Sequence, residues 1–494
     1  MSKEYYTTIG LEIHAELNTK SKMFCGCINN PDEKTPNVNI CPICMAHPGT
    51  LPVINKKAVE SVIKVGLALG ADIADFTEFD RKNYFYPDIP KAYQITQYKF
   101  PIVSGGKLKG VDITRVHLEE DTATSKHFGG DPEGKSTSNG AGYSLVDFNR
   151  AGVPLMELVT EPVIHSAKQA GDFGRELQLL LRYLVVSEAN MEKGEMRVEL
   201  NISISEDPVK LGTKVEVKNI NSFRAIERAA EYETKRMTEL LENGRGNEIV
   251  QETRGWDENK QSTFSQRTKE NANDYRYFPD PDLPKLFLNK VFDIKKMRSE
   301  LPELPEAKRN RCRNDYGIKD EDIESYITDQ ELGKYFEEVA EFFQGISSRS
   351  ETERGDSLEK IRLASNYITS DYLGLKKIHL EVQLPNVKNF AELIQMVSDG
   401  KISSRGAKDI LAMIVIKDES PMKIAEEKGL IQNHNEEALK EIVQKVIDAN
   451  PAVVATYKGG KENALMSLVG QVMKESKGSA NPALVQKLLK ELLT

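Results

Sequence analysis

Apolar and polar residues alternate strictly in the segment Ile9–Leu17 near the start of the chain. Ile9, Leu11, Ile13, Ala15 and Leu17 are apolar, and the residues between them are Gly10, Glu12, His14 and Glu16. Successive side chains of a β-strand point to opposite faces, so this pattern predicts a half-buried strand. Its polar face would carry two carboxylates around an imidazole.

Three further segments have the same kind of pattern. In Met196–Ser205, Glu199 lies on the polar side. In Thr213–Asn219, Glu216 lies on the side opposite to Val215 and Val217. The turn-like residues between these two runs predict an antiparallel hairpin. Val111–Asp121 begins by alternating and ends in an acidic cluster. We expect all four segments to be strands of one sheet with a buried apolar side and a polar side.

Acidic side chains from separate strands would then converge on the polar side of that sheet. The candidates are Glu12, His14, Glu119 or Glu120, Glu199 and Glu216. Carboxylates this close together repel one another and need a cation or a raised pKa to coexist. Oxygen ligands with one imidazole suit Mg²⁺ or Mn²⁺ better than zinc, and Mg²⁺ of this kind commonly assists phosphoryl transfer. The alternative is that these are ordinary solvated strand faces. Because four strands show the same pattern, a metal-binding site is favoured.

The periodicity changes along the 494 residues and predicts an α+β protein of three domains. Residues 1–293 read as a mixed, mainly antiparallel-sheet cradle, residues 294–405 as a helical domain, and residues 406–494 as a small helical tail. The stretch Pro279–Pro284 resembles a hinge at the first change. The second boundary is expected near Ser403–Gly406, before amphipathic helices that include Glu436–Ala449.

Composition narrows the class of protein. Apolar residues make up 39% of the chain and charged residues 29%, and no apolar run approaches the roughly 20 residues that span a bilayer. The first residues show no apolar core of a secretion signal, so we expect a soluble, cytoplasmic protein without a membrane partner. The net charge of -9 argues against a generic cationic nucleic-acid binder, although it leaves room for local basic patches.

Four of the five cysteines are crowded into residues 25–44. Cys25 and Cys27 form one close pair, Cys41 and Cys44 another, and Cys312 stands alone. Thiols of a chain without a secretion signal are expected to be reduced, so four thiolates closing a structural zinc site are favoured over disulfides. Free thiols around a loop, or a redox pair, remain alternatives. The zinc would pin the loop that follows the first strand.

One motif match does not predict a function. Residues 129–136, GGDPEGKS, satisfy the phosphate-binding pattern GxxxxGK[ST]. A P-loop follows a buried strand and opens a helix. The residues before this match are not an apolar strand, and those after it are poor helix formers. A hairpin loop is therefore the better prediction.

Long stretches of the chain together resemble a known family. Besides IGLEIHAEL near the start, they are RKNYFYPD (81–88), KAYQI (91–95), HLEED (117–121), VDFNRAGVPLMEL (146–158), VEVKNINS (215–222), DYRYFPDPDL (274–283) and the tail segment 459–478. In this order they resemble the GatB family, one of the subunits of the aspartyl/glutamyl-tRNA amidotransferase. The resemblance covers essentially the whole chain.

The resemblance implies a glutamine-hydrolysing carbon–nitrogen ligase that works as a heterotrimer. In such enzymes, ATP and Mg²⁺ serve to phosphorylate the side-chain carboxylate of mischarged Glu-tRNA(Gln) or Asp-tRNA(Asn), and ammonia then forms the amide. This chain carries neither a Ser-rich amidase signature nor a convincing Cys/His pair. We therefore expect ammonia to come from a separate amidase subunit, which a small third subunit fastens to this chain.

The resemblance also assigns roles residue by residue. It implies metal and active-site roles for Glu12, His14, Glu119, Glu120, Glu199 and Glu216, with Mg²⁺ at Glu12, His14, Glu120 and Glu216. It implies substrate or ATP binding for Lys82, Tyr84, Asn149, Arg150, Lys218 and Asn219. Packing is the alternative for Tyr84, Phe85 and Tyr86.

The helical tail is the expected tRNA-binding part. It carries a mild excess of lysines suited to phosphate contacts, namely Lys458, Lys461, Lys474, Lys477, Lys487 and Lys490. Ordinary solvated helix faces would explain any one of them equally well. A different class of function also stays open, a non-catalytic, zinc-stabilised scaffold that binds tRNA in the same complex. The archaeal tRNA(Gln)-specific paralogue is excluded, because the chain has no room for its large inserted domain.

Overall fold

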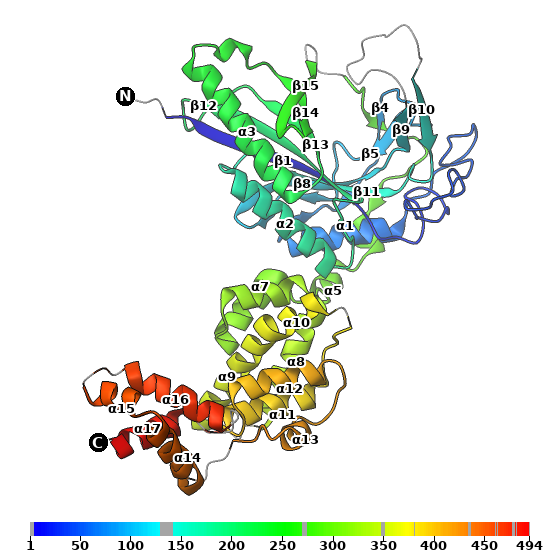
Figure 1. Cartoon of the computed structure of the whole chain (residues 1–494). Helices are drawn as coiled ribbons and strands as arrows, with labels where there is room; N and C mark the ends of the chain where they lie inside the picture. Colours follow the sequence, from blue (N-terminus) through cyan, green and yellow to red (C-terminus); the bar gives the residue numbers. More distant parts are fainter. Residues whose placement is uncertain are drawn as a thin grey trace. The chain divides into compact units, whose positions relative to one another are not determined.

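A computed structural model describes the chain as two compact units, Met1–Pro305 and Glu306–Thr494 (Figure 1). The described residues are 4–128, 142–268, 274–346, 351–379, 381–432, 436–459, 461, 463–476, 480 and 482–493. The GxxxxGK[ST] match at 129–136 lies outside them. The structure divides after Pro305, and the predicted three-domain division with a first boundary at 293–294 stays a prediction.

A ten-stranded sheet forms the centre of the first unit. Its order is β15 (Ser262–Thr268), β14 (Glu252–Asp257), β13 (Val215–Ile220), β12 (Met196–Ser205), β1 (Tyr6–Glu16), β11 (Pro154–Thr160), β8 (Val111–Glu120), β6 (Val103–Ser104) and β2 (Asp72–Ile73), with β7 (Lys107–Leu108) also paired to β8. Neighbours pair antiparallel except for β13 and β14. The predicted hairpin is therefore present as the β12–β13 pair.

Helices cover the apolar face of this sheet. They are α1 (Lys56–Ala68), α2 (Ala167–Tyr183) and α3 (Phe223–Glu242), whose N-caps are Asn55, Ser166 and Ser222. Each cap side chain accepts a hydrogen bond from a backbone N–H of the first helical turn, which would otherwise lack an intrahelical partner. Residues of all three helices share one hydrophobic core with alternate residues of β1 and β12, such as Ile13 and Leu200. The polar residues of these strands are thereby directed to the other face.

Smaller sheets complete the first unit. The three-stranded sheet consists of β16 (Phe278–Pro279), β4 (Asp80–Asn83) and β5 (Tyr93–Thr96). Two further pairs are β17 (Leu286–Phe287) with β3 (Phe76–Thr77), and β9 (Thr124–Phe128) with β10 (Tyr143–Asp147). The short helices are η1 (Gly246–Glu248), α4 (Leu288–Val291), α5 (Ile294–Ser299) and the start of α6 (Pro305–Arg311).

The stretch predicted as a hinge is tied to the three-stranded sheet. Pro279 is the last residue of β16, and the Asp280 carboxylate lies 2.8 Å from Nε of Arg81 on β4. Asp282 bonds the same guanidinium at 3.0 Å. The carboxylates of this stretch thus fasten it within the first unit.

The second unit is helical in the residues that the structure describes. Its elements are α6, η2 (Cys312–Tyr316), α7 (Asp320–Thr328), α8 (Gln330–Ile346), α9 (Glu351–Asn366), η3 (Tyr367–Tyr372), α10 (Leu373–Ile378), α11 (Val387–Ser398), α12 (Ser404–Ile414), α13 (Pro421–Glu427), α14 (Glu436–Ala449), α15 (Pro451–Lys458), α16 (Asn463–Glu475) and α17 (Pro482–Leu493). The predicted α+β class, sheet first and helices after, is confirmed. Among the described residues, no helix is long and apolar enough to cross a membrane.

The last four helices have a hydrophobic core of their own. It is built from residues of 439–493, among them Val443, Leu468 and Leu488. Helix α12, capped by Ser403, instead packs against α11 and α13. The predicted boundary near 405 stays a prediction, and the separate core begins with α14.

A buried ion-pair network joins α3 to the sheet edge. Glu233 of α3 is fully buried, and its carboxylate accepts 2.6 and 3.1 Å bonds from Arg236 and lies 3.3 Å from Nε of Arg254 on β14. The Thr263 hydroxyl of β15 also donates to it. Removing the carboxylate would leave the Arg236 guanidinium without this anion and would leave Arg254 with only its 2.6 Å pair to Glu252.

We expect Glu233→Ala to lower the free energy of unfolding by about 3–5 kcal/mol, the usual cost of breaking a buried ion pair. The only tryptophan of the chain, Trp256, is buried in β14, so its fluorescence during urea denaturation reports on this edge directly. The exposed Glu231→Ala on the same helix is the control and should change stability by less than about 0.5 kcal/mol. Equal urea midpoints for both variants would contradict the expectation.

Candidate active site on the polar face of the sheet

Four neighbouring strands place charged side chains in one row across the polar face. The sheet register sets Arg197 of β12 opposite His14 of β1, His14 opposite Glu157 of β11, and Glu157 opposite His117 of β8. Directly opposed residues in a sheet have their side chains within interaction distance. The row therefore places the Glu157 carboxylate between two histidines, with Arg197 beyond His14.

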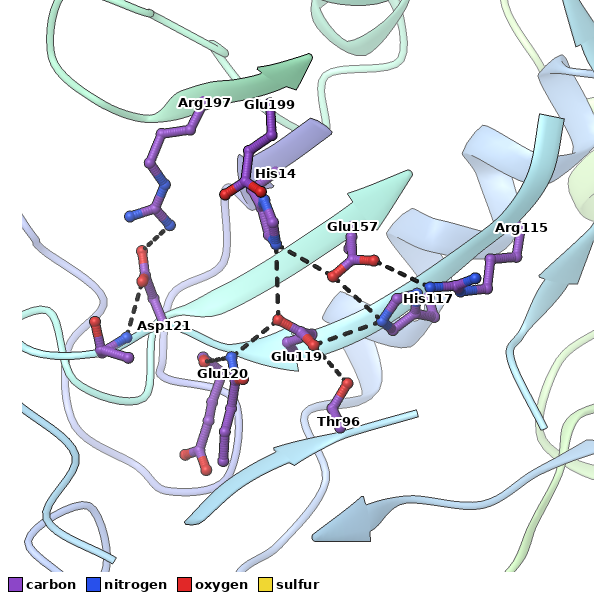
Figure 2. A network of polar contacts seen from close by, with 12 residues as sticks. His14, Thr96, Arg115, His117, Glu119, Glu120, Asp121, Glu157, Arg197 and Glu199 are labelled. Atoms are coloured by element: carbon purple, nitrogen blue, oxygen red, sulfur yellow. Dashed lines mark hydrogen bonds and ion pairs between the residues drawn. The ribbon is translucent and has the colours of Figure 1, made fainter. Parts of the chain in front are cut away.

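Two histidines and two glutamates meet at the centre of this face, and Figure 2 shows His14, Glu119 and Glu157 turned toward one another. Nε2 of His14 lies 3.2 Å from Oε2 of Glu157 and 3.8 Å from Oε2 of Glu119. Nε2 of His117 lies 3.6 Å from Oε1 of Glu119 and 3.7 Å from Oε2 of Glu157. We call these four residues the central cluster. Their side chains are at most 14% exposed.

The three-stranded sheet holds the central cluster from the other side. On β5, Thr96 Oγ1 donates a 2.6 Å hydrogen bond to Oε1 of Glu119, and Gln94 Nε2 donates one of 2.9 Å to Oε2. Nη2 of Arg115 lies 3.3 Å from Oε1 of Glu157. Both buried carboxylates therefore have fixed directions.

A second acidic group adjoins the central cluster. Glu12 of β1 lies opposite Glu199 of β12, and Lys218 of β13 donates bonds of 2.8 and 2.9 Å to the Glu199 carboxylate. Lys218 is also 3.7 Å from Oε1 of Glu216, whose other oxygen accepts a 2.7 Å bond from Thr253. The lysine thus pairs with two of the three carboxylates, and its charge reaches Glu12 only at longer range.

The protonation of these groups follows from burial and neighbouring charge. Burial, and then the like charges of Glu157 and Glu199, raise the pKa of Glu12 to about 7. Burial lowers the pKa of His14, but its hydrogen bond to Glu157 and the charges of Glu157 and Glu119 outweigh burial and raise that pKa to about 9. Burial raises the pKa of Glu157, but the charges of His117 and His14 outweigh it and hold that pKa well below its usual range.

The donor atoms on this face fit a divalent cation. His14, Glu119 and Glu157 each offer one donor, as do Glu12, His14 and Glu199, and within each trio these atoms lie within 4.8 Å of one another. Carboxylate oxygens with an imidazole suit Mg²⁺ or Mn²⁺ once the imidazole has given up its proton, which cation binding would displace. A cation here would also offset the repulsion that raises the pKa of Glu12.

Glu120 lies apart from the central cluster. It is adjacent to Glu119 on β8, so the alternation of the strand directs the two side chains to opposite faces. The Glu120 carboxylate pairs with Lys91 and accepts a 3.0 Å bond from the backbone N–H of Ile95. The predicted Mg²⁺ set is therefore brought together at Glu12 and His14, with Glu216 beside them and Glu120 turned away.

Some of the residues predicted to bind substrate or ATP lie at the polar face, and others bond the backbone elsewhere. Lys218 and Lys82 lie at the polar face. Asn149 is buried, and its amide bonds the backbone of residues 35–39 in the cysteine loop. Arg150 donates to the carbonyl oxygens of Thr122 and Ala123. Asn219, at φ 63°, donates to the carbonyl of Trp256.

Lys82 and Tyr84 border the central cluster on the side of the three-stranded sheet. Burial lowers the pKa of Lys82, but the charges of Glu119, of the neighbouring tyrosines and of Glu157 outweigh burial and hold that pKa above its ordinary value. The Tyr84 hydroxyl lies 3.3 Å from Oε1 of Gln94, which itself bonds Glu119. Lys82 is thus a half-buried cation available to an anionic substrate group.

Sequence reasoning missed several residues of this site. Glu157 is the most important, because it contacts both histidines, and the others are His117, Arg197, Arg115, Gln94 and Thr96. A signal for Glu157 was present. It is the only charged residue in the otherwise apolar run of β11, PLMELVT, where a buried strand has little reason to carry a carboxylate.

The four cysteines of the loop come together as predicted. Their sulfur atoms lie within 4.8 Å of one another, and the backbone N–H of Cys41 points to Sγ of Cys44 at 3.2 Å. A hydrogen bond from Cys25 lowers the pKa of Cys44 to about 5, so one thiolate forms readily. The cluster could hold a metal ion such as zinc.

Known proteins match this chain over its whole length. Residues 7–292 match the family model described as the GatB/GatE catalytic domain, and residues 353–493 match that of the GatB domain. The B subunit of the aspartyl/glutamyl-tRNA(Asn/Gln) amidotransferase from Crocosphaera subtropica is 42% identical over 510 residues, covering 99% of this chain and 98% of its own. Its counterpart from Moorella thermoacetica is 43% identical over 502 residues, covering 99% and 100%.

The sheet unit with its buried acidic site, followed by helices, is thus the architecture of a catalytic subunit with a helical C-terminal part. The chain belongs to the GatB family, the B subunits of aspartyl/glutamyl-tRNA(Asn/Gln) amidotransferases.

We expect the purified protein to contain one zinc ion per chain, measured by elemental analysis. Cys41→Ser should lose the ion, because three sulfurs and a hydroxyl no longer close a tetrahedral thiolate site. Cys312→Ser, which changes the cysteine outside the cluster, is the control and should keep it. Wild-type protein without zinc would remove the assignment.

Proposed function

We propose that this chain is the catalytic GatB subunit of a cytoplasmic, tRNA-dependent amidotransferase. Its substrate would be Glu-tRNA(Gln), Asp-tRNA(Asn) or both, and its product the corresponding amide. The reaction would use ATP to phosphorylate the side-chain carboxylate of the mischarged amino acid and ammonia to displace the phosphate. The observation that carries the proposal is the set of converging carboxylates and histidines on the polar face, in a chain similar throughout to amidotransferase subunits.

The chemistry accounts for such a face. A carboxylate is a poor electrophile because oxide is a poor leaving group, whereas phosphate leaves readily. Transfer of a phosphoryl group between anions requires that negative charge be offset at the point of transfer. Mg²⁺, when bound, would supply part of that offset. Lys82 and Lys218 are the nearby side chains suited to phosphate oxygens.

The residues of the site have distinct proposed roles. His14, Glu119 and Glu157, together with Glu12 and Glu199, would hold the cation. Gln94 and Thr96 would orient Glu119, and Arg115 would orient Glu157.

The partners follow from the ammonia requirement. We propose that a separate amidase subunit releases ammonia from glutamine and that a small third subunit fastens the amidase to this chain. The zinc loop would hold its part of the fold rather than react, because four thiolates leave no open position on the metal.

The test is the complex reconstituted with the amidase and the small third subunit, supplied with ATP and each mischarged tRNA. We expect Glu157→Gln and Glu12→Gln to lower transamidation by about 100-fold or more, because each removes a charge that positions the cation. Binding of tRNA should be unchanged.

The exposed Glu192→Gln is the matched control and should retain full activity. Glu120→Gln is informative beside it, because Glu120 pairs with Lys91 and not with the central cluster. Full activity of both Glu157→Gln and Glu12→Gln would support the scaffold function instead. Comparing Glu-tRNA(Gln) with Asp-tRNA(Asn) in this assay identifies the substrate.

The helical tail gives a second prediction. A deletion from residue 406 would remove α12 from its contact with α11, so the deletion should begin at Glu436, where the helices with a separate core start. We expect it to weaken tRNA binding, by about 10-fold if the lysines contact phosphates, and to leave ammonia-dependent chemistry on saturating tRNA within about 2-fold. Unchanged tRNA affinity, measured by filter binding, would refute a role of the tail in holding tRNA.

A further inference from the structure

Five tyrosine rings form a continuous chain beside the central cluster. Tyr86 contacts Tyr84 at a centroid distance of 6.3 Å, Tyr84 contacts Tyr275 at 6.0 Å, and Tyr275 contacts Tyr277 at 6.0 Å. Tyr277 stacks on Tyr98 at 4.2 Å and an interplanar angle of 6°. The rings come from three separate segments, which the pairing of β16, β4 and β5 brings together.

The chain of rings passes the site near its middle and reaches the surface at both ends. Near the middle, Nζ of Lys82 lies 5.2 and 5.8 Å from the ring centroids of Tyr275 and Tyr84. The Tyr84 hydroxyl reaches Gln94, which bonds Glu119. At its outer ends, Tyr86 and Tyr98 are each 63% exposed.

The composition of this surface points to a particular kind of ligand. Aromatic rings offer flat faces on which unpaired nucleobases stack whatever their identity. A row of rings is longer than the single base of a mononucleotide needs, whereas an unpaired strand of RNA presents several bases in succession.

We propose that these tyrosines stack the unpaired nucleotides at the 3′ end of the aminoacylated tRNA and so guide its amino acid to the central cluster. This inference rests on the proposed function and adds a site for the end of the substrate. The exposed rings would receive the bases nearer the acceptor stem. The inner rings and Lys82 would receive the terminal nucleotide and its phosphate.

The experiment compares two probes in the reconstituted three-subunit complex: deacylated tRNA(Gln), and the same tRNA without its terminal CCA. The wild-type complex should bind the intact probe more tightly. Tyr98→Ala and Tyr86→Ala should each lower the affinity for the intact probe by about 5-fold to 150-fold, the range for loss of one stacked base. Their affinity for the truncated probe should equal that of the wild-type complex.

Two controls separate stacking from folding. Tyr98→Phe keeps the ring that stacks on Tyr277 and should bind the intact probe within about 2-fold of wild type. Phe264→Ala removes another exposed aromatic ring, on β15 at the far edge of the large sheet, and should change neither probe.

Three results would overturn the inference. The first is equal affinity of the wild-type complex for both probes. The second is a raised KM for ATP in the tyrosine variants with tRNA discrimination unchanged, which would assign the rings to the adenine of ATP. The third is loss of the amidase or the small third subunit from the variants with discrimination unchanged, which would assign the rings to a protein contact. A wild-type complex that discriminates between the probes but amidates no mischarged tRNA would overturn the proposed function alone.

Discussion

The structure depends on keeping like charges together on the polar face of a sheet. Five carboxylates, Glu12, Glu119, Glu157, Glu199 and Glu216, are contributed by β1, β8, β11, β12 and β13, and their repulsion would separate these strands if nothing offset it. The offset comes from opposite charges in register: two histidines in the central cluster, Lys218 between two glutamates, and Arg115 beside another. The hydrophobic core on the far face supplies the remaining stabilisation. The charge of Glu12 is offset least. Its raised pKa shows that burial and the neighbouring carboxylates are only partly compensated by positive charge at this position.

Period-two alternation was sufficient to predict four of the central strands and which of their residues share the polar face. Glu12, His14, Glu199 and Glu216 are found there because each lies between two buried apolar residues of its own strand. The prediction left Glu119 and Glu120 open, although Val116 and Leu118 are apolar and buried and therefore place Glu119, with His117, on the polar face. Alternation gave no signal for Glu157, because β11 is buried along most of its length and its sequence does not alternate.

The residues around the carboxylates could not be predicted from any local pattern. Gln94 and Thr96 reach Glu119 only because a separate small sheet folds over the large one, and no periodicity in one segment states which other segment will cover it. Asn149 is a different case. It belongs to a long matching stretch and was expected to face a substrate, yet its amide bonds the cysteine loop. Membership in a motif shows that a residue matters without showing whether it binds a ligand or fixes the backbone beside one.

The register of β1 has one more consequence. Its alternation serves the core and the site at once, since Leu11 and Ile13 are buried on one side while Glu12 and His14 point to the other. A single residue inserted in this strand would exchange the two sides over the length that follows it, burying charge and exposing hydrocarbon. Evolution can therefore vary the length of the loops around this strand, but it cannot lengthen or shorten the strand itself by one without losing both the fold and the chemistry.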